Sequence, residues 1–422
     1  MKLLVKPSVL NGAIQSSPSK SYSHRALVFG LLADGRSTLQ NVLLSEDTLA
    51  TLRAVQAFGA KASINGDSVI VDGGRLTCPE DVLNLDNSGT TIRIMAGVAS
   101  LLSCATVLTG DASIRGRPMQ PLLDALSELG VTAFSTRNNG LAPLVIRGPN
   151  KGTKTHIRGD VSSQFISSLL ISSALKEVDT EIVLTSPLKS RPYVEITMGM
   201  MRTFGGSVEM TKTGLNVLGK QRYRPQTYKV PGDYSSAAFP LVAGALTESV
   251  TVAGLDPEDK QGDKAILDIL EAFGARVKRG NSSARAEPGE LNGQRIDLAN
   301  APDLFPIVAV LGSQAKGTTD IFNAEHVRLK ESDRIRATTD FLKAMGAKIE
   351  EKKDGCVIRG PTPLVGAEVD SLDDHRILMA AAVAALVAEG KTTISHGDCY
   401  KVSYPFFLDD MKALGANMEL VP

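Results

Sequence analysis

The sequence predicts an α/β protein of two domains, assembled from six similar units. Its 422 residues are too many for a single hydrophobic core. Six segments share one pattern, in which an apolar helical face ends at a glycine and a short alternating run follows. These glycines stand at positions 59, 130, 205, 274, 346 and 415, at intervals of 71, 75, 69, 72 and 69 residues. Such regular spacing indicates internal repeats that fill the chain.

The fourth segment shows the pattern most clearly. Its apolar residues between Ile266 and Phe273 recur at i, i+3, i+4 and i+7, which is the buried stripe of an amphipathic helix. Gly274 stands where a left-handed cap is needed, and the alternation over 276–278 predicts a strand. A unit of this length holds more than one helix and several strands, so we interpret each as a supersecondary block, three to a domain.

The domain boundaries follow from the short sixth unit. Gly415 lies seven residues before the end of the chain, so the opening strand over 2–6 could complete the last sheet. We therefore expect one domain of residues 1–12 and 231–422, with repeats four to six, and another of residues 13–230, with repeats one to three. The chain would cross between them near Asn11-Gly12 and near Pro231-Gly232, where glycine and proline favour a break.

Composition excludes several classes of function. Lys+Arg and Asp+Glu are equal at 46 each, which argues against nucleic acid and against a membrane surface as partners. The four cysteines form no Cys-x-x-Cys pair, which argues against zinc and against a disulfide framework and fits a reducing cytosol. No apolar run is long enough to span a bilayer, and the opening residues lack a signal-length apolar region. We expect a soluble, cytoplasmic protein.

Cations and hydroxyls recur where apolar helices are expected to begin. The stretch 86–93 precedes an apolar run, and its Gly89 would let an anion approach the backbone while Arg93 adds a full charge. The stretch 16–25 likewise places hydroxyls with Lys20 and Arg25 ahead of 26–32. Taken alone, each is also explained by an ordinary capped helix with solvated cations.

The same arrangement appears five more times. Arg117 precedes Pro118, which fixes where the arginine points at a helix start, and an arginine also precedes a proline in 190–193. Ser162 and Ser163 precede an apolar helix that they could simply cap. The charged run 328–336 starts a repeat helix, although a solvated, salt-bridged helix explains most such runs. Residues 373–376 open the last long apolar helix.

Asp303 is the one carboxylate in an otherwise apolar context, 299–306. A lone aspartate there is usually a helix cap. If it is partly buried, its proton affinity rises toward what a general base needs. Because so many cations stand at helix starts in a neutral protein, packed units could aim them at one ligand, and this favours small polyanions.

Eight motifs carry a resemblance to a known family. They are Lys20-Ser21-x-Ser23-x-Arg25, Asn87-x-Gly89-Thr90-x-x-Arg93, Arg117-Pro118, Ser162-Ser163-Gln164-Phe165, Ser190-x-Pro192-Tyr193, Pro302-Asp303, Lys330-Glu331-Ser332-Asp333-Arg334 and Asp374-His375-Arg376. In this order they resemble the 5-enolpyruvylshikimate-3-phosphate synthase family over nearly the whole chain. The resemblance implies two domains, each of three βαβαββ repeats, in an inside-out α/β barrel. It also implies transfer of the enolpyruvyl group of phosphoenolpyruvate to shikimate 3-phosphate, with no metal and no organic cofactor.

The resemblance assigns site residues one by one. Those for shikimate 3-phosphate are Lys20, Ser21, Arg25, Ser162, Ser163, Gln164, Ser190, Tyr193, Asp303, His326 and Lys330. Those for phosphoenolpyruvate are Lys20, Gly89, Arg117, Gln164, Arg334, Arg376 and Lys401. The implied catalytic residues are Asp303 as the base, with Glu331 and Lys20 as acids. His326 stands where many members have asparagine, and Lys401 is one residue before the position of the family's C-terminal lysine, which is Val402 here.

Two alternatives remain at this point. The sister carboxyvinyl transferase that acts on UDP-N-acetylglucosamine commonly has a cysteine in the loop before the arginine-proline pair, and 110–117 has none. A non-catalytic anion-binding paralogue is disfavoured because Lys20, Asp303 and Glu331 are all present. We expect a monomer. Since the expected cations are divided between two domains, we also expect the free protein to be open and to close on its substrates.

Overall fold

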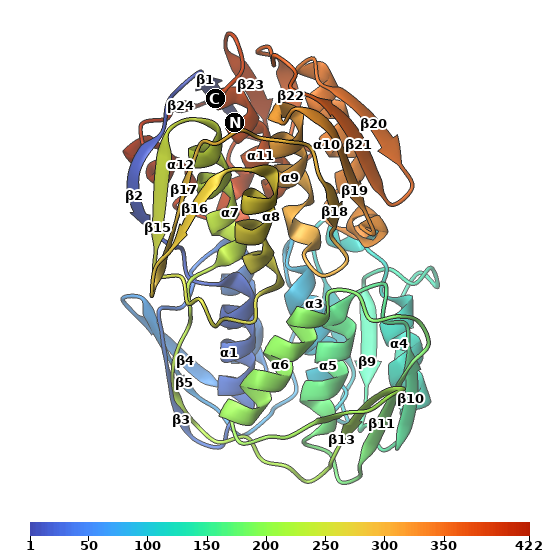
Figure 1. Cartoon of the computed structure of the whole chain (residues 1–422). Coiled ribbons are helices and arrows are strands. Elements are labelled where there is room, and N and C mark those ends of the chain that lie inside the picture. Colours follow the sequence, from blue (N-terminus) through green and yellow to red (C-terminus); the bar gives the residue numbers. More distant parts are fainter. The chain divides into compact units, whose positions relative to one another are not determined.

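The computed structural model describes residues 1–422 as two compact units (Figure 1). Unit 1 contains Met1–Ser17 and Pro231–Pro422, and unit 2 contains Pro18–Val230. The boundary expected at residue 12 falls inside a strand, β2 (Asn11–Gln15), and unit 1 extends five residues further, to Ser17. This strand pairs in parallel with β15 (Ser249–Ala253), and the pairing keeps it in unit 1.

Each unit holds three four-stranded sheets of one topology, in which a parallel pair is followed by two antiparallel neighbours. In unit 2 the sheets are, in strand order, β14 (Thr227–Lys229), β3 (Arg36–Gln40), β5 (Ser68–Asp72) and β4 (Lys61–Asn65); β6 (Leu83–Asn84), β7 (Thr106–Thr109), β9 (Leu144–Arg147) and β8 (Thr132–Ser135); and β10 (Lys154–Ile157), β11 (Thr180–Leu184), β13 (Gly214–Val217) and β12 (Glu209–Met210). In unit 1 they are β2, β15, β17 (Ser283–Glu287) and β16 (Arg276–Arg279); β18 (Arg295–Asp297), β19 (Gly317–Phe322), β21 (Gly355–Gly360) and β20 (Lys348–Lys352); and β22 (Glu368–Asp370), β23 (Thr392–Ser395), β1 (Lys2–Lys6) and β24 (Asn417–Val421). The opening strand β1 therefore lies between β23 and β24 in the sixth sheet.

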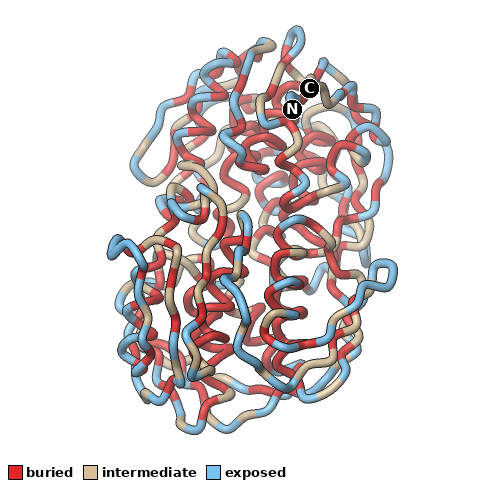
Figure 2. Tube along the Cα trace, turned by 180° about the vertical axis from the view of Figure 1, so that it is seen from behind, coloured by how far each residue is buried: buried red, intermediate tan, exposed pale blue.

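The helices fall into two classes, and both follow from the sequence pattern. Helices that are apolar on all sides are buried on nearly every residue; they are α1 (Lys20–Leu32), α3 (Gly89–Ala99), α5 (Ser163–Ser173), α7 (Tyr234–Leu246), α9 (Phe305–Gln314) and α11 (His375–Leu386). Helices with one apolar face bury only that face; they are α2 (Glu46–Ala57), α4 (Gln120–Glu128), α6 (Arg191–Thr203), α8 (Ala265–Phe273), α10 (Arg334–Ala344) and α12 (Phe407–Ala413). Short 3-10 turns complete the list: η1 (Ile114–Gly116), η2 (Gly262–Lys264), η3 (Pro302–Leu304), η4 (Glu325–Leu329) and η5 (Cys399–Val402). Figure 2 shows the buried stretches running through the helices and the exposed ones along connecting loops.

The six repeat glycines all have positive φ, between 81° and 108°. Gly274, for example, ends α8 in the left-handed region, and its N–H donates to the carbonyl of Glu271. A residue with a Cβ is disfavoured in this region, which explains why glycine stops each of these helices. The α/β class and the six repeats predicted from the sequence are confirmed.

Aromatic stacking holds the core of unit 2 together. The rings of Phe29 and Phe204 stack at 5.1 Å, and Tyr223 meets Phe29 edge-on at 5.0 Å. These residues come from the first and third repeats, so the repeats share one core. Every helix in the structure is too short or too polar to cross a lipid bilayer.

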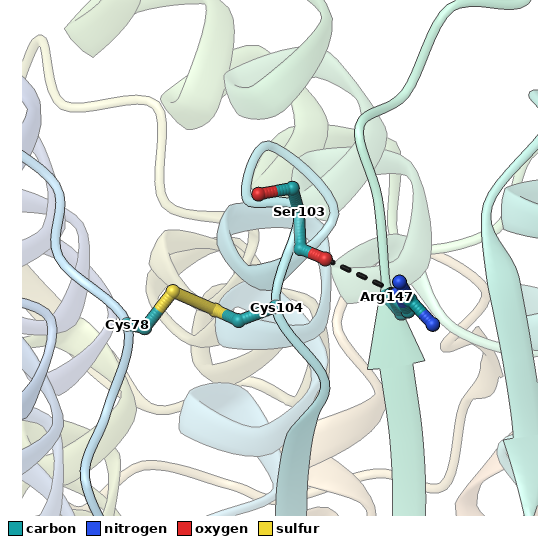
Figure 3. The surroundings of a disulfide bond; sticks show 4 residues. All are labelled: Cys78, Ser103, Cys104 and Arg147. Atoms are coloured by element: carbon teal, nitrogen blue, oxygen red, sulfur yellow. Dashed lines mark hydrogen bonds between the residues drawn. A yellow bond between two sulfur atoms is a disulfide. The ribbon is translucent and has the colours of Figure 1, made fainter.

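A disulfide bond joins Cys78 and Cys104 in unit 2 (Figure 3). This corrects the expectation from cysteine spacing, which argued against disulfides. The two residues lie 26 positions apart, but the loop after β5 and the loop after α3 bring their Cα atoms within 6.2 Å. The carbonyl of Ser103 also accepts a hydrogen bond from Nε of Arg147 at 3.2 Å, which fixes the second loop on β9. Cys356 and Cys399 are buried free thiols.

We expect the double change Cys78→Ser and Cys104→Ser to lower the free energy of unfolding by about 2 to 4 kcal/mol, because it removes a cross-link from the unfolded chain. Urea denaturation of oxidised protein and of the variant measures the difference. Wild-type protein treated with a reductant should match the variant. Equal stability of oxidised and reduced wild type would contradict the prediction.

Candidate active site

Three helix N-termini of unit 2 carry the residues predicted for the site. α1 begins at Lys20, whose ammonium lies 2.8 Å from the carboxylate of Asp47 on α2. α3 begins at Gly89, after the cap residue Ser88. α5 begins at Ser163, and the hydroxyl of Ser162 caps it by accepting the N–H of Gln164. Free N–H groups at such ends attract anions.

Arg25 is the most buried cation of this group, with 1% of its surface exposed. Its guanidinium donates to Oγ1 of Thr197 at 2.7 Å, to Oγ of Ser167 at 3.2 Å and to the carbonyls of Ser21 and Tyr193. All these partners are neutral. Burial lowers the pKa of Arg25 to about 10, although the nearby tyrosines oppose the shift. A buried charge without a carboxylate partner is costly, and a bound anion would offset that cost.

Two further arginines of unit 2 are oriented by neighbouring side chains. Nη1 of Arg93 donates to Oε1 of Gln164 at 2.6 Å, and its guanidinium lies over the ring of Phe165. Nη2 of Arg117 donates to Oδ1 of Asn87 at 2.6 Å and to Oγ of Ser113. Both arginines are largely buried, so their positions are set by packing as well as by hydrogen bonds.

Gly89 lies directly beside these two guanidinium groups. A Cβ on this residue would stand 2.9 Å from Nη1 of Arg117 and 3.4 Å from Nη1 of Arg93. The glycine therefore leaves room for the arginines at the start of α3. The sequence suggested that Gly89 leaves space for an anion, whereas in the structure the atoms nearest to this space belong to the two arginines.

A chain of hydrogen bonds near these helix ends was not predicted from the sequence. Nδ1 of His24 lies 2.6 Å from Oγ1 of Thr51, which lies 2.6 Å from Oγ1 of Thr91, which lies 2.6 Å from Oγ of Ser88. Burial, together with the cations of α1, lowers the pKa of His24 well below its usual value, so this histidine stays neutral. The chain links α1, α2 and α3. Its only sequence signal was the density of hydroxyl residues at the helix starts.

The remaining predicted residues of unit 2 lie at the start of α6. Ser190 precedes this helix in the left-handed conformation, with φ 52°, and is buried. Tyr193 follows in the first turn, and its carbonyl accepts from Arg25 at 3.3 Å. The hydrogen bonds of Arg25 thus connect the starts of α1, α5 and α6.

In unit 1, Arg334 lies at the centre of a charged cluster. It begins α10, is 1% exposed, and donates to three carboxylates: Asp303 at 2.7 Å, Asp374 at 2.8 Å and Glu331 at 2.5 Å. Asp374 is fully buried and also caps α11 by accepting the N–H of Arg376. The sequence identified Arg334 and Glu331. It gave Asp374 no role beyond its place in a motif.

Asp303 is shared among three cations. Besides Arg334, its carboxylate lies 3.2 Å from Nη2 of Arg376 and 3.6 Å from Nζ of Lys330. Burial raises the pKa of Asp303, but Arg376, Lys330 and Arg334 outweigh it and hold the pKa well below the usual value for an aspartate. The expectation that burial would raise its proton affinity is therefore wrong for the free protein.

Two predicted residues of unit 1 lie outside the contacts just described. His326 is buried in η4. Lys401 is exposed on η5, and its ammonium makes no hydrogen bond or ion pair. The structure thus brings Asp303, Lys330, Glu331, Arg334 and Arg376 together and leaves Lys401 without a partner.

The chain is similar to known proteins along nearly its whole length. A family model described as EPSP synthase (3-phosphoshikimate 1-carboxyvinyltransferase) matches residues 4–411. The chain is 52% identical over 422 residues to the 3-phosphoshikimate 1-carboxyvinyltransferase of Methanocorpusculum labreanum, covering 99% of this chain and 100% of the relative. It is 46% identical over 429 residues to that of Methanocaldococcus jannaschii, with both chains fully covered.

Solved structures show the same likeness. EPSP synthase from Acinetobacter baumannii superposes with a TM-score of 0.83 at 27% identity and covers 100% of both chains. The enolpyruvyl transferase NikO from Streptomyces tendae has a TM-score of 0.80 at 20% identity, covering 99% of this chain and 98% of its own, and supports the fold alone. The extent of these matches and the arrangement of the charged residues agree: the chain belongs to the EPSP synthase (3-phosphoshikimate 1-carboxyvinyltransferase) family.

Proposed function

We propose that Asp303, Glu331 and Lys20 carry the proton transfers of this family's reaction. The chain is a 3-phosphoshikimate 1-carboxyvinyltransferase. It transfers the enolpyruvyl group of phosphoenolpyruvate to the 5-hydroxyl of shikimate 3-phosphate and releases phosphate, in the shikimate pathway to aromatic amino acids. The observation that carries the residue assignment is the contact of one carboxylate, Asp303, with three cations.

The proposed contacts of shikimate 3-phosphate are Lys20, Ser21, Arg25, Ser162, Ser163, Gln164, Ser190, Tyr193, Asp303, His326 and Lys330. The neutral partners of Arg25 support this assignment, because the guanidinium is buried with no carboxylate to balance it. The helix N-termini at Lys20 and Ser163 add N–H groups for the phosphate and carboxylate.

Phosphoenolpyruvate is assigned to Lys20, Gly89, Arg117, Gln164, Arg334, Arg376 and Lys401. Arg117 is already oriented by Asn87 and Ser113, which favours a bidentate contact with an anionic group. Arg334 and Arg376 now contact Asp303. When an anionic substrate binds these arginines, it shares their charge with that aspartate.

This sharing gives Asp303 its role as a base. In the free protein, Arg376, Lys330 and Arg334 hold the pKa of Asp303 too low for efficient proton abstraction. The two substrates bring roughly five negative charges, which reduce the positive potential at the carboxylate and so raise its proton affinity. We infer that Asp303 becomes an effective base only when both substrates are bound.

The proton transfers then follow the bonds that form and break. In the addition step the 5-hydroxyl oxygen bonds to C2 of phosphoenolpyruvate, Asp303 accepts the hydroxyl proton, and Glu331 or Lys20 protonates the methylene carbon. In the elimination step the C2–O bond to phosphate breaks, the methyl carbon returns a proton to the same group, and Asp303 gives the proton it accepted to the departing phosphate. Phosphate and the enolpyruvyl ether are the products.

A phosphate-release assay with both substrates tests the proposal. We expect turnover with phosphoenolpyruvate and shikimate 3-phosphate, and none when UDP-N-acetylglucosamine replaces the latter. Release with the nucleotide sugar would favour the sister transferase. Binding of both substrates without release would favour a non-catalytic paralogue.

Gly89→Ala should raise the KM for phosphoenolpyruvate roughly 5- to 150-fold, which corresponds to about 1 to 3 kcal/mol of overpacking. The new methyl group would displace the guanidinium of Arg117 from Asn87 and Ser113. Steady-state kinetics give the KM, and titration calorimetry gives the affinity for shikimate 3-phosphate, which should hardly change. If both ligands weaken together, the fold is damaged; if neither does, Gly89 is only a turn residue.

We also propose that the two compact units are the functional domains and that the protein is a cytoplasmic monomer. The support for the two domains is that each unit has its own three sheets and its own core. Sedimentation equilibrium over a range of concentrations tests the monomer. A mass near twice 44.7 kDa would contradict it.

A further inference from the structure

A cavity of about 960 Å³ lies at the carboxyl ends of the three inner helices of unit 2. Leu32 ends α1, Leu101 lies just beyond α3, and Leu175 lies just beyond α5, and all three line the cavity. The proposed substrate residues lie at the opposite ends of these helices, about 15 to 20 Å away at 1.5 Å per residue. The cavity is therefore separate from the site described above, and its volume is typical of sites for small ligands.

Lys176 is the buried cation of this cavity. It is 5% exposed, and its ammonium donates to Oδ1 of Asn150 at 3.2 Å and to the carbonyl of Gly152. Both acceptors are neutral, and no carboxylate lies within ion-pair distance. Burial lowers its pKa to about 8, which reflects a charge that nothing nearby balances. An ammonium has three donors, and two are used.

Asn150 provides a second unsatisfied donor at the same wall. The residue is 4% exposed, and its Nδ2 has no hydrogen-bond partner. Its Oδ1 accepts from Lys176, so the amide orientation is fixed by that bond and Nδ2 remains the donor. Buried donors without partners are rare, and they indicate a missing acceptor.

Charge around the cavity points to the same chemistry. Lys151, Lys220 and Arg222 line it with Lys176, against only Asp34 and Glu177. The lining also includes Tyr223 and the leucines Leu32, Leu76, Leu101 and Leu175. The walls thus combine excess positive charge with apolar surface.

The helix ends themselves do not balance the ammonium. Their carbonyls already accept backbone N–H groups: Leu31 from Gly74, Ser100 from Asn150, and Ala174 from Gln221. These bonds satisfy the carbonyls that would otherwise attract a cation. Since no carboxylate lies within ion-pair distance of the ammonium, an anion bound in the cavity would balance its charge.

We propose that this cavity binds a small organic anion, whose carboxylate or phosphate is held by Lys176 and Asn150 and whose apolar body lies against the leucines. The disulfide adds rigidity, because Cys78 and Cys104 lie within three residues of Leu76 and Leu101. The site is independent of the transfer reaction. It would let a metabolite contact the carboxyl ends of helices whose other ends hold the substrates.

Phenyl phosphate is the probe, with inorganic phosphate as the matched probe that lacks an apolar body. Titration calorimetry compares wild type, Lys176→Met and Lys212→Met, an exposed lysine of the same unit. We expect wild type and Lys212→Met to bind one phenyl phosphate more per chain than Lys176→Met. Inorganic phosphate should bind this extra site at least 10-fold more weakly. Equal affinity for the two probes would overturn the apolar part of the assignment.

Nuclear magnetic resonance of the wild-type protein tests the same proposal without relying on a folded variant. In protein labelled with ¹³C at the lysine ε carbons, Lys176 should titrate near its pKa of about 8 without ligand and rise toward 10.5 with saturating phenyl phosphate. An anion stabilises the ammonium and so raises its pKa. An unchanged Lys176 titration would overturn the proposal and leave ordered water as the partner of both donors.

Discussion

Asp303→Ala lowers kcat by about 10²- to 10⁴-fold, the usual cost of removing a general base. The reason is that the 5-hydroxyl then has no group to accept its proton. Asp303→Asn keeps the size of the side chain and removes only the basic oxygen, so its kcat should fall as far. Phosphate release under saturating substrates measures kcat, and calorimetry measures the affinity for shikimate 3-phosphate, which should change far less.

The control for this prediction is Asp340→Asn. Asp340 lies in the same unit, its side chain is 66% exposed, and it pairs only weakly with Arg336 at 3.9 Å. The substitution changes the net charge equally but should leave kcat within twofold. Near-normal turnover in Asp303→Asn would remove this carboxylate from the mechanism.

Asp374→Ala is expected to lower the free energy of unfolding by about 2 to 4 kcal/mol, because it removes one of the three carboxylates that compensate the buried charge of Arg334. Arg334 is 1% exposed and Asp374 is 0% exposed, so water cannot replace the lost carboxylate. The change also removes the cap of α11. Urea denaturation followed by circular dichroism gives the free energy.

Kinetics of the same variant provide a second measurement. Because Arg334 loses its two bonds to Asp374 and keeps only those to Asp303 and Glu331, its guanidinium is held less firmly, and the KM for phosphoenolpyruvate should rise. Asp340→Ala, an exposed site in the same unit, should change stability by less than about 0.5 kcal/mol. A loss of similar size in both variants would show that the buried pair has no special contribution.

The six repeats could be recognised in the sequence because a glycine ends one helix in each of them. Each repeat glycine stops a helix through a positive φ that other residues adopt at a cost, so its position is visible in the chain without knowledge of any contact. The same holds for the inner helices, whose continuous apolar runs predict burial on all sides. The pairing of the strand near the first crossing, β2, could not be predicted from the neighbouring sequence. β2 is assigned to unit 1 by its pairing with β15, more than 200 residues later.

The contacts within the charged cluster around Arg334 could not be predicted from the sequence. Arg334 was recognisable as a cation at a helix start, but Asp303 and Asp374 lie 31 and 40 residues from it in the chain. A pKa depends on all charges within a few ångströms, so the direction of the shift at Asp303 depends on which cations the fold brings to it. Burial alone suggested that the pKa of Asp303 would rise, whereas the neighbouring cations lower it.

The sequence by itself determined the α/β repeats, the family and the residue types of the site, because these depend on periodicity, on glycine conformation and on motifs that are contiguous in the chain. Only the tertiary structure decided the Cys78–Cys104 disulfide, the depressed pKa of Asp303, the hydroxyl chain from His24 to Ser88 and the cavity around Lys176. The physical reason is the same in each case. Hydrogen bonds, ion pairs and desolvation act over a few ångströms in space, and the groups concerned are distant in the chain.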